Sequence, residues 1–185
     1  GGISLHITPS IGIAVFPADG DNVNTLIKNA DAAMYLAKEK GRNNYQFYTP
    51  LLNSRTLDRL KLESDLRLAL NHGGFELHYQ PQIFAHSGNL WGAEALVRWR
   101  HPERGLVSPA DFIPIAEETG LIIPLGEWVF AEAARQVTAW RKQGLPNLVV
   151  SVNISAVQFR KDDFVERIKT ILKEEGAAAH SLELE

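Results

Sequence analysis

The sequence predicts an α/β protein in which the later part is built from parallel βα units. Hydrophobic residues make up 45% of the 185 residues, which is typical of a globular protein. Short runs rich in β-branched and aromatic residues alternate with longer stretches of helical spacing. Because helices of this length separate the later strands, those strands are expected to run parallel.

The first fifty residues predict a strand, a helix and a second strand. Residues 3–17 are rich in Ile, Val and Phe and predict β structure that ends in a turn at "PADGDN". Apolar residues then recur with helical spacing over 23–40, and Gly41 predicts the stop. Residues 44–48 predict a short strand, and "TPLLNS" (49–54) predicts a boundary between two units.

A second unit is expected to start near residue 55 with a charged helix that ends at Gly73 and Gly74. Two alternating segments follow and predict a β-hairpin, and Ser108 with Pro109 predicts the start of a helix. The expected later elements are strands 75–84, 90–100, 148–155 and 181–185 and helices 108–120, 124–144 and 162–176.

Composition limits the classes of partner and compartment. The formal net charge of −3 gives no electrostatic argument for a nucleic-acid partner. The sequence has no Cys, which excludes disulfides and thiolate metal sites and fits a reducing, cytoplasmic setting. No apolar run approaches the roughly 20 residues of a membrane span. The chain starts on a strand pattern without a leader or Met and stops on a strand, so we expect a fragment at both ends, with any membrane contact only through segments upstream of it.

The segment "WGAEALVRW" (91–99) places charged side chains in an apolar strand. Because strand side chains alternate, Glu94, Leu96 and Arg98 share one face and the neighbouring alanines share the other. Arg98 lies roughly 13 Å beyond Glu94 along the strand, which suits a phosphate contact beside a metal ligand. The alternative is a solvated carboxylate or a simple ion pair.

Oxygen ligands gather where three expected strands end. Glu94 belongs to the first strand, Asn153 to "VSVNIS", and Glu183 and Glu185 to "SLELE". Carboxylates and amides are hard donors that suit Mg²⁺, Mn²⁺ or Ca²⁺, and the carboxyl rim of barrel strands is where chemistry occurs. Gln80 faces away from Tyr79 and is a further candidate for contact with the same ligand.

Five ordered segments resemble the EAL domain family of bacterial cyclic di-GMP phosphodiesterases, which have a modified TIM barrel. They are "HYQPQ", "GAEALVRW", "SPADFIPIAEETG", "VNISAVQF" and "LELE". The stretch from "ITPSIGIAVFP" to "NYQFY" resembles the C-terminal part of a GGDEF (diguanylate cyclase) domain. The resemblance therefore implies the end of a GGDEF domain over 1–50, a linker and first EAL helix over 51–72, and the N-terminal half of an EAL barrel, a partial barrel, over 73–185.

The EAL resemblance implies roles for individual residues. Metal ligands are implied at Glu94, Asn153 and Glu185, and substrate contacts at Gln80, Leu96 and Arg98. In the family, two metals (Mg²⁺ or Mn²⁺) activate a bridging water that attacks the phosphodiester of cyclic di-GMP and gives linear pGpG. A homodimer is implied for the intact protein.

Further residues of the family site are expected beyond residue 185. These are an Asp pair, a Lys and a Glu, so this chain alone is expected to be inactive. Asp162 and Asp163 are not that Asp pair, because they precede "LELE", and a helix N-cap is expected there. The alternative function is a cyclic di-GMP receptor without turnover.

The GGDEF resemblance implies roles for fewer residues of this chain than the EAL resemblance does. The signature that binds GTP is expected upstream of residue 1, and Lys38 and Arg42 match positions that contact GTP phosphates. We favour the alternative that these two cations complement the dipole at a helix C-terminus.

Overall fold

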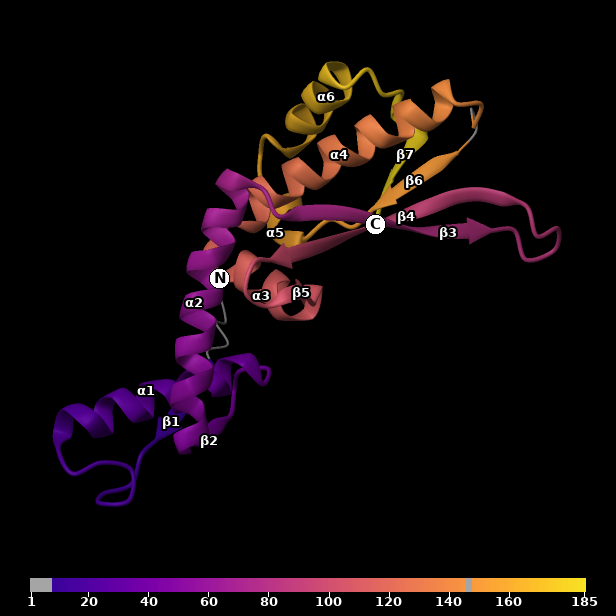
Figure 1. Ribbon diagram of the computed structural model, residues 1–185. Coiled ribbons are helices and arrows are strands. Elements are labelled where there is room, and N and C mark those ends of the chain that lie inside the picture. The colour runs from indigo at the N-terminus through magenta and orange to yellow at the C-terminus, as the bar shows by residue number, and fades with distance from the viewer. Residues whose placement is uncertain (1–7, 146–147) are drawn as a thin grey trace, which may run out of the picture. The chain divides into compact units, whose positions relative to one another are not determined.

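The structure is a computed structural model that describes residues 8–145 and 148–185 (Figure 1). The chain forms two compact units, Gly1–Leu62 and Glu63–Glu185. Strand β1 spans only Ile11–Ile13, and residues 3–7 of the β segment predicted at 3–17 lie outside the described residues. The prediction was too long because the partner strand β2 (Tyr45–Phe47) offers only three residues for pairing.

The first unit is a β–α–β element with parallel strands, as predicted. Helix α1 (Val23–Glu39) begins at Asn22, whose side-chain oxygen accepts a hydrogen bond from the backbone N–H of Thr25 at 2.9 Å. Gly12 in β1 lies so close to α1 that a Cβ there would be 1.9 Å from the carbonyl oxygen of Ala30. The absence of a side chain at Gly12 therefore lets the strand touch the helix.

Helix α2 (Pro50–His72) begins inside the segment that was predicted as a boundary. Pro50 takes the first helical position, where a missing N–H costs nothing. Leu52 is buried against Ala32 and Ala33, and this packing keeps the start of the helix ordered. The helix ends before Gly73, as predicted, and Gly73 has a positive φ of 89°.

The second unit is built on a sheet in the order β3-β4-β6-β7, with β5 added to β4. The strands are β3 (Phe75–Ile83), β4 (Leu90–His101), β5 (Gly105–Val107), β6 (Val149–Val152) and β7 (Leu182–Leu184). The predicted hairpin is confirmed by antiparallel pairing of β3 with β4, and β4, β6 and β7 pair in parallel. Strand β5 was not predicted.

Helices α3 (Pro109–Thr119), α4 (Ile122–Lys142) and α6 (Phe164–Glu174) confirm the predicted helices, and α5 (Ala156–Phe159) is a short one that was not predicted. Ser108 caps α3, as predicted, and accepts a hydrogen bond from the backbone N–H of Ala110 at 3.3 Å. In the described part of the chain, no helix combines the length and the apolar character that a membrane crossing requires.

The N-cap prediction at residues 162–163 was right in position only. Asp163 precedes the first residue of α6, but its side chain makes no capping hydrogen bond. Its backbone has φ −93° and ψ 2° instead of the extended conformation of a typical cap, so the carboxylate is not aimed at the free N–H groups.

The core lies between the sheet and helices α3 and α4. Trp99 of β4, Phe112 of α3 and Phe130 of α4 are buried, and the rings of Trp99 and Phe112 meet edge-on with centroids 5.6 Å apart. The ring of Phe75 of β3 contacts both Trp99 and Trp128 in tilted arrangements, with centroids 5.9 Å and 5.8 Å apart. The face of β4 that carries its alanines and Trp99 is therefore the helix-facing side, as the alternation predicts.

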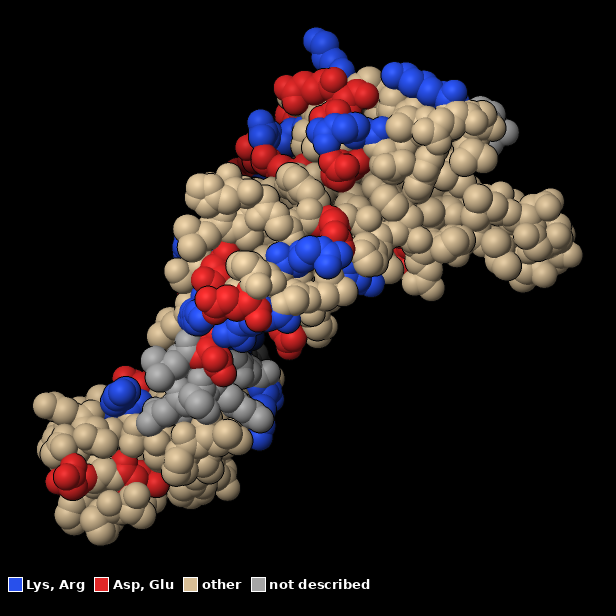
Figure 2. Space-filling view, viewed as in Figure 1, with Lys and Arg blue, Asp and Glu red and all other residues tan. Residues whose placement is uncertain are grey.

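Helices α4 and α6 lie side by side over the sheet (Figure 1), joined by two ion pairs. Arg135 donates to Glu175 at 2.8 Å, and Arg167 donates to Glu127 at 2.5 Å. Acidic and basic side chains are interspersed on the part of this unit seen in Figure 2, so that view has no patch of a single sign. Exposed pairs of this kind add little stability individually.

Candidate functional site

The strand register places polar side chains in one row across the sheet. Gln80 of β3 lies opposite Glu94 of β4, Glu94 lies beside Ser151 of β6, and Ser151 lies beside Glu183 of β7. Residues that lie directly opposite one another in neighbouring strands point to the same face. The same registers, continued one position, bring Asn153 level with Leu96 and Glu185.

Glu94 and Asn153 are in direct contact, although 59 residues separate them in the sequence. The side-chain N–H of Asn153 donates to Oε1 of Glu94 at 2.7 Å. Ser151 is fully buried beside them, and its hydroxyl donates to Glu183 at 3.5 Å, the limit of a hydrogen bond. Two of the three predicted metal ligands are thus brought together by side-chain contact.

Glu185 joins this edge through its backbone. Its N–H donates to the carbonyl oxygen of Val152 at 3.0 Å, and its carbonyl oxygen accepts from the N–H of Ile154 at 2.8 Å. These two bonds continue the pairing of β6 with β7 past the end of both strands. Both sequence neighbours of Asn153, Val152 and Ile154, are therefore hydrogen-bonded to the backbone of Glu185.

One detail of the predicted geometry was wrong. We expected Glu94 near the carboxyl end of its strand, but it lies in the first half of β4, which continues to His101. The shorter strands β6 and β7 end beside it, at Val152 and Leu184. Glu94 still lies at the carboxyl edge of the parallel strands because β4 extends past them to pair with β3 and β5.

Arg98 is half-buried and has no acidic partner in the described residues. Its Nη1 donates to the carbonyl oxygen of Val97 at 3.0 Å, which leaves most of the guanidinium donors unused. Arg98, Leu96 and Asn153 line one cavity of about 330 Å³. Gln80 is exposed and does not line this cavity. An Arg with free donors in a cavity is suited to a phosphate.

Three residues of this region were missed in the sequence. Glu117, Ser155 and Gln158 line the same cavity, and Ser155 donates to Oε1 of Glu117 at 2.6 Å. Ser155 and Gln158 form a capping box at the start of α5. The pattern "SAVQ" carries the spacing of a capping box, so this pair was detectable. Nothing in the sequence indicates the contact with Glu117, because α3 and α5 meet only in the fold.

The residues present have the donor chemistry for a hard divalent cation. They offer the carboxylates of Glu94 and Glu185 and the amide oxygen of Asn153, whose nitrogen is engaged with Glu94. Over residues 8–145 and 148–185, no three His, Cys, Asp or Glu side chains cluster as a metal site. A cation held by Glu94 and Glu185 would therefore also use the amide oxygen of Asn153.

Two ionisable groups of strand β3 have shifted pKa values and are not among the candidate site residues. A hydrogen bond from Arg100, with a smaller contribution from His78, holds the pKa of Glu76 below its usual range. Burial, with the charge of Glu132 nearby, raises the pKa of the Tyr79 hydroxyl. The Tyr79 ring packs edge-on against Trp140 with centroids 4.7 Å apart, and its hydroxyl has no hydrogen-bond partner among the residues that the structure describes.

The two candidate cations of the first unit lie where a helix dipole favours them. Lys38 is in the last turn of α1, and Arg42 follows the helix with a positive φ of 59°. The backbone N–H of Arg42 donates to the carbonyl oxygen of Ala37 at 3.1 Å and so caps the helix end. Their geometry fits the structural alternative, complementing the helix end.

Comparison with known families gives two matches. Residues 63–185 match the EAL domain, and residues 1–44 match the family described as "Diguanylate cyclase, GGDEF domain". The GGDEF match therefore precedes the EAL match along the chain, which is the order that the sequence motifs predicted.

Curated relatives match almost the whole chain. The bifunctional diguanylate cyclase/cyclic di-GMP phosphodiesterase MucR of Pseudomonas aeruginosa is 45% identical over 97% of the chain and 25% of its own length. The cyclic di-GMP phosphodiesterase PdeR of Escherichia coli is 45% identical over 93% of the chain and 26% of its own length. The chain thus spans about a quarter of the length of these relatives.

Solved structures agree on the fold. The structure of the PaMucR phosphodiesterase in complex with c-di-GMP has a TM-score of 0.65 and 42% identity, over 67% of this chain and 50% of that one. The EAL enzyme Bd1971 in its cAMP-bound form has a TM-score of 0.62 and 31% identity, over 72% of this chain and 39% of that one.

Proposed function

Because the chain belongs to the EAL domain family over residues 63–185, with the end of a GGDEF domain over residues 1–44, we propose that the complete protein hydrolyses cyclic di-GMP to linear pGpG. The relatives MucR and PdeR are named as cyclic di-GMP phosphodiesterases, which supports this substrate. The observation that carries the proposal is the 2.7 Å contact between Glu94 and Asn153. It joins Glu94 of β4 to Asn153, which follows β6 and lines the same cavity as Arg98.

In this proposal Glu94, Asn153 and Glu185 hold a divalent cation of the Mg²⁺ or Mn²⁺ type, one of a pair. When bound, such cations supply a more acidic water and neutralise charge on the phosphoryl oxygens. Ligands for the second cation come from parts of the protein outside this chain.

The residues of this chain bind and orient the phosphodiester. The guanidinium of Arg98 binds one phosphate through its unused N–H donors, while Leu96 packs against the substrate and Gln80 donates to it. Water oxygen forms a new bond to phosphorus, the bond from phosphorus to the ribose 3′ oxygen breaks, and that oxygen takes up a proton. The product is linear pGpG with a 5′-phosphate.

We also propose that the 185 residues alone do not turn over cyclic di-GMP. They span a quarter of the length of the relatives and half of the solved PaMucR chain. The exposed position of Gln80 and the small donor set around Glu94 support a site that needs more of the protein to close.

The test is hydrolysis of cyclic di-GMP by the complete protein with Mg²⁺ or Mn²⁺, with pGpG resolved by chromatography. We expect steady formation of pGpG and a loss of at least roughly 100-fold for E94A, because a metal ligand is removed. E166A is the matched control, since Glu166 is an exposed residue of α6 that pairs with Lys169 and lies outside the row of Glu94. Binding of cyclic di-GMP without any pGpG would contradict the proposed hydrolysis and would favour a receptor.

A further inference from the structure

The turn that follows β6 carries Asn153 and is fixed by three other elements. Its residue Ile154 donates its N–H to the carbonyl oxygen of Glu185 beyond β7 at 2.8 Å. Its last residue, Ser155, donates its hydroxyl to Glu117 of α3 at 2.6 Å and its N–H to Oε1 of Gln158 in α5 at 3.1 Å. The position of the Asn153 side chain therefore depends on contacts made by the next two residues.

Among the residues that hold this turn, Glu117 is a partly buried carboxylate, and its position needs a separate explanation. It is half-buried, and it makes no ion pair with any residue that the structure describes. Burying part of a carboxylate without a cation costs free energy unless hydrogen bonds compensate. The short bond from Ser155 is charge-assisted and is the kind of contact that compensates it. Glu117 and Asn153 also line the same cavity.

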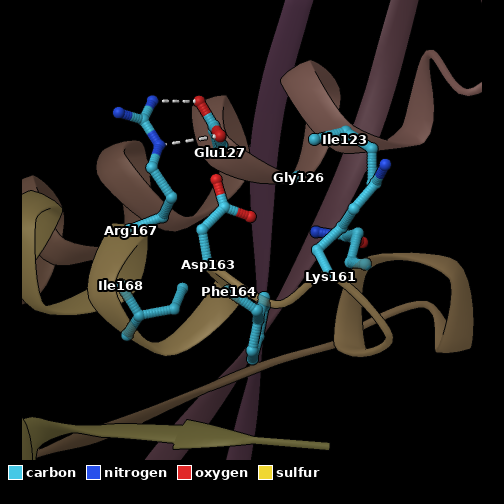
Figure 3. Close-up of a pocket in the computed structure, with 9 residues that line it drawn as sticks. Ile123, Gly126, Glu127, Lys161, Asp163, Phe164, Arg167 and Ile168 are labelled. Carbon is cyan, nitrogen blue, oxygen red and sulfur yellow. Dashed lines mark hydrogen bonds and ion pairs between the residues drawn. The ribbon is translucent and has the colours of Figure 1, made fainter.

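The other side of the turn is fixed by close packing between α4 and α5. Gln158 is only 6% exposed, and a Cβ on Gly126 would be 1.8 Å from its side-chain nitrogen. Gly126 thus makes room in α4 for Gln158, although glycine is a poor helix former. These two residues line both the cavity near Arg98 and a second cavity of about 210 Å³, which Figure 3 shows with the ion pair of Glu127 and Arg167.

We propose that Glu117 is a positioning residue for the cation site. Through the Ser155 hydroxyl it fixes the turn so that the Asn153 amide meets Glu94 with its oxygen free for a cation. This inference rests on the proposed function only in assigning Glu94 and Asn153 to a divalent cation. Glu117 itself contacts neither the cation nor the phosphodiester.

The test measures Mn²⁺ binding to the complete protein by electron paramagnetic resonance of free Mn²⁺, which does not depend on turnover. We expect E117A to bind Mn²⁺ roughly 10-fold to 100-fold more weakly, the usual effect of losing a residue that orients a ligand. E117Q keeps an oxygen that accepts the Ser155 hydroxyl and is expected to stay within about 3-fold. E127A is the matched control, because Glu127 pairs with Arg167 away from the turn and its loss leaves Mn²⁺ affinity unchanged.

A double variant separates positioning from direct binding. If Glu117 acts through Ser155, S155A already weakens Mn²⁺ binding and E117A adds no further loss in that background. A full additional loss in E117A/S155A would overturn the positioning role. Affinity of E117A and E117D equal to that of the unchanged protein would also overturn it. E117D keeps the charge with a shorter reach, so it gives the same answer if E117A unfolds.

The outcomes distinguish this inference from the proposed hydrolysis. Mn²⁺ binding that depends on Glu94 and Glu117, in a protein that forms no pGpG, refutes the proposed hydrolysis and supports the positioning role. Formation of pGpG by a protein in which E117A binds Mn²⁺ normally refutes the positioning role alone. Mn²⁺ binding that E94A does not change refutes the assignment of the cation site and with it this inference.

Discussion

Replacing Gly126 with alanine places a methyl group 1.8 Å from the nitrogen, 2.5 Å from Cδ and 2.8 Å from the oxygen of the Gln158 side chain. All three separations are far below van der Waals contact, so Gln158 has to leave its position. Because Gln158 is buried and accepts the N–H of Ser155 at 3.1 Å, its movement also breaks the capping box of α5.

Three effects set the size of the change in unfolding free energy. Overpacking of a buried site costs about 1–3 kcal/mol. The lost hydrogen bond costs about 1 kcal/mol, and the better helix propensity of alanine returns about 1 kcal/mol. We therefore expect G126A to lower the free energy of unfolding by about 1–3 kcal/mol.

The measurement is equilibrium urea unfolding of the chain, followed by tryptophan fluorescence. All four Trp residues lie in the unit Glu63–Glu185, so the signal reports the unit that contains Gly126. The double variant G126A/Q158A is the control, because removing the Gln158 side chain makes room for the methyl group. It should be more stable than G126A alone. Equal stability of G126A and the unchanged chain would refute the argument from close packing, as would a double variant no more stable than G126A.

Three further predictions follow from contacts of the same unit. Y79F should raise the free energy of unfolding by about 1 kcal/mol in urea titrations, because it removes a buried hydroxyl that has no partner in the described part of the chain; a destabilised variant would show that the hydroxyl has one. E76Q should lower the melting temperature at pH 7, and this difference should shrink as the pH falls below the ordinary pKa of Glu76, because the lowered pKa gives stability that is present above the ordinary value and lost as the pH falls through the folded value; an effect that stays the same at every acidic pH would contradict this. R98A should weaken cyclic di-GMP binding about 10-fold to 100-fold by calorimetry, with R98K in between, since Lys keeps the charge and loses the planar donor set; unchanged affinity would exclude a phosphate contact.

The sequence predicted those parts of the fold and site that depend on alternation along a strand. The separation of Glu94 and Arg98 from Trp99 follows from side-chain period alone, and the structure keeps it. The ends of elements depend on partners instead. Helix α2 starts early because Leu52 packs on α1, and the four residues of α5 are too few to show a helical period.

The residues that support the site were harder to predict than the candidate ligands. Asn153 follows a recognisable strand, whereas Glu117 reaches Ser155 from an element 38 residues away. Buried His101 likewise meets Asp65 of α2 at 3.1 Å across 36 residues. Contacts between helices, or between a helix and a strand, set such pairs, and no local pattern encodes them.

Strand β4 contributes to the core and to the candidate site at once. One face carries Trp99 and the alanines that pack under the helices, and the other carries Glu94 and Arg98. Shifting its pairing by a single residue would exchange the two faces, burying both charges and exposing the tryptophan. A misregistered sheet would therefore lose stability and the arrangement of the site together, so a chain with this error would be unfolded or degraded instead of persisting as a stable but defective protein.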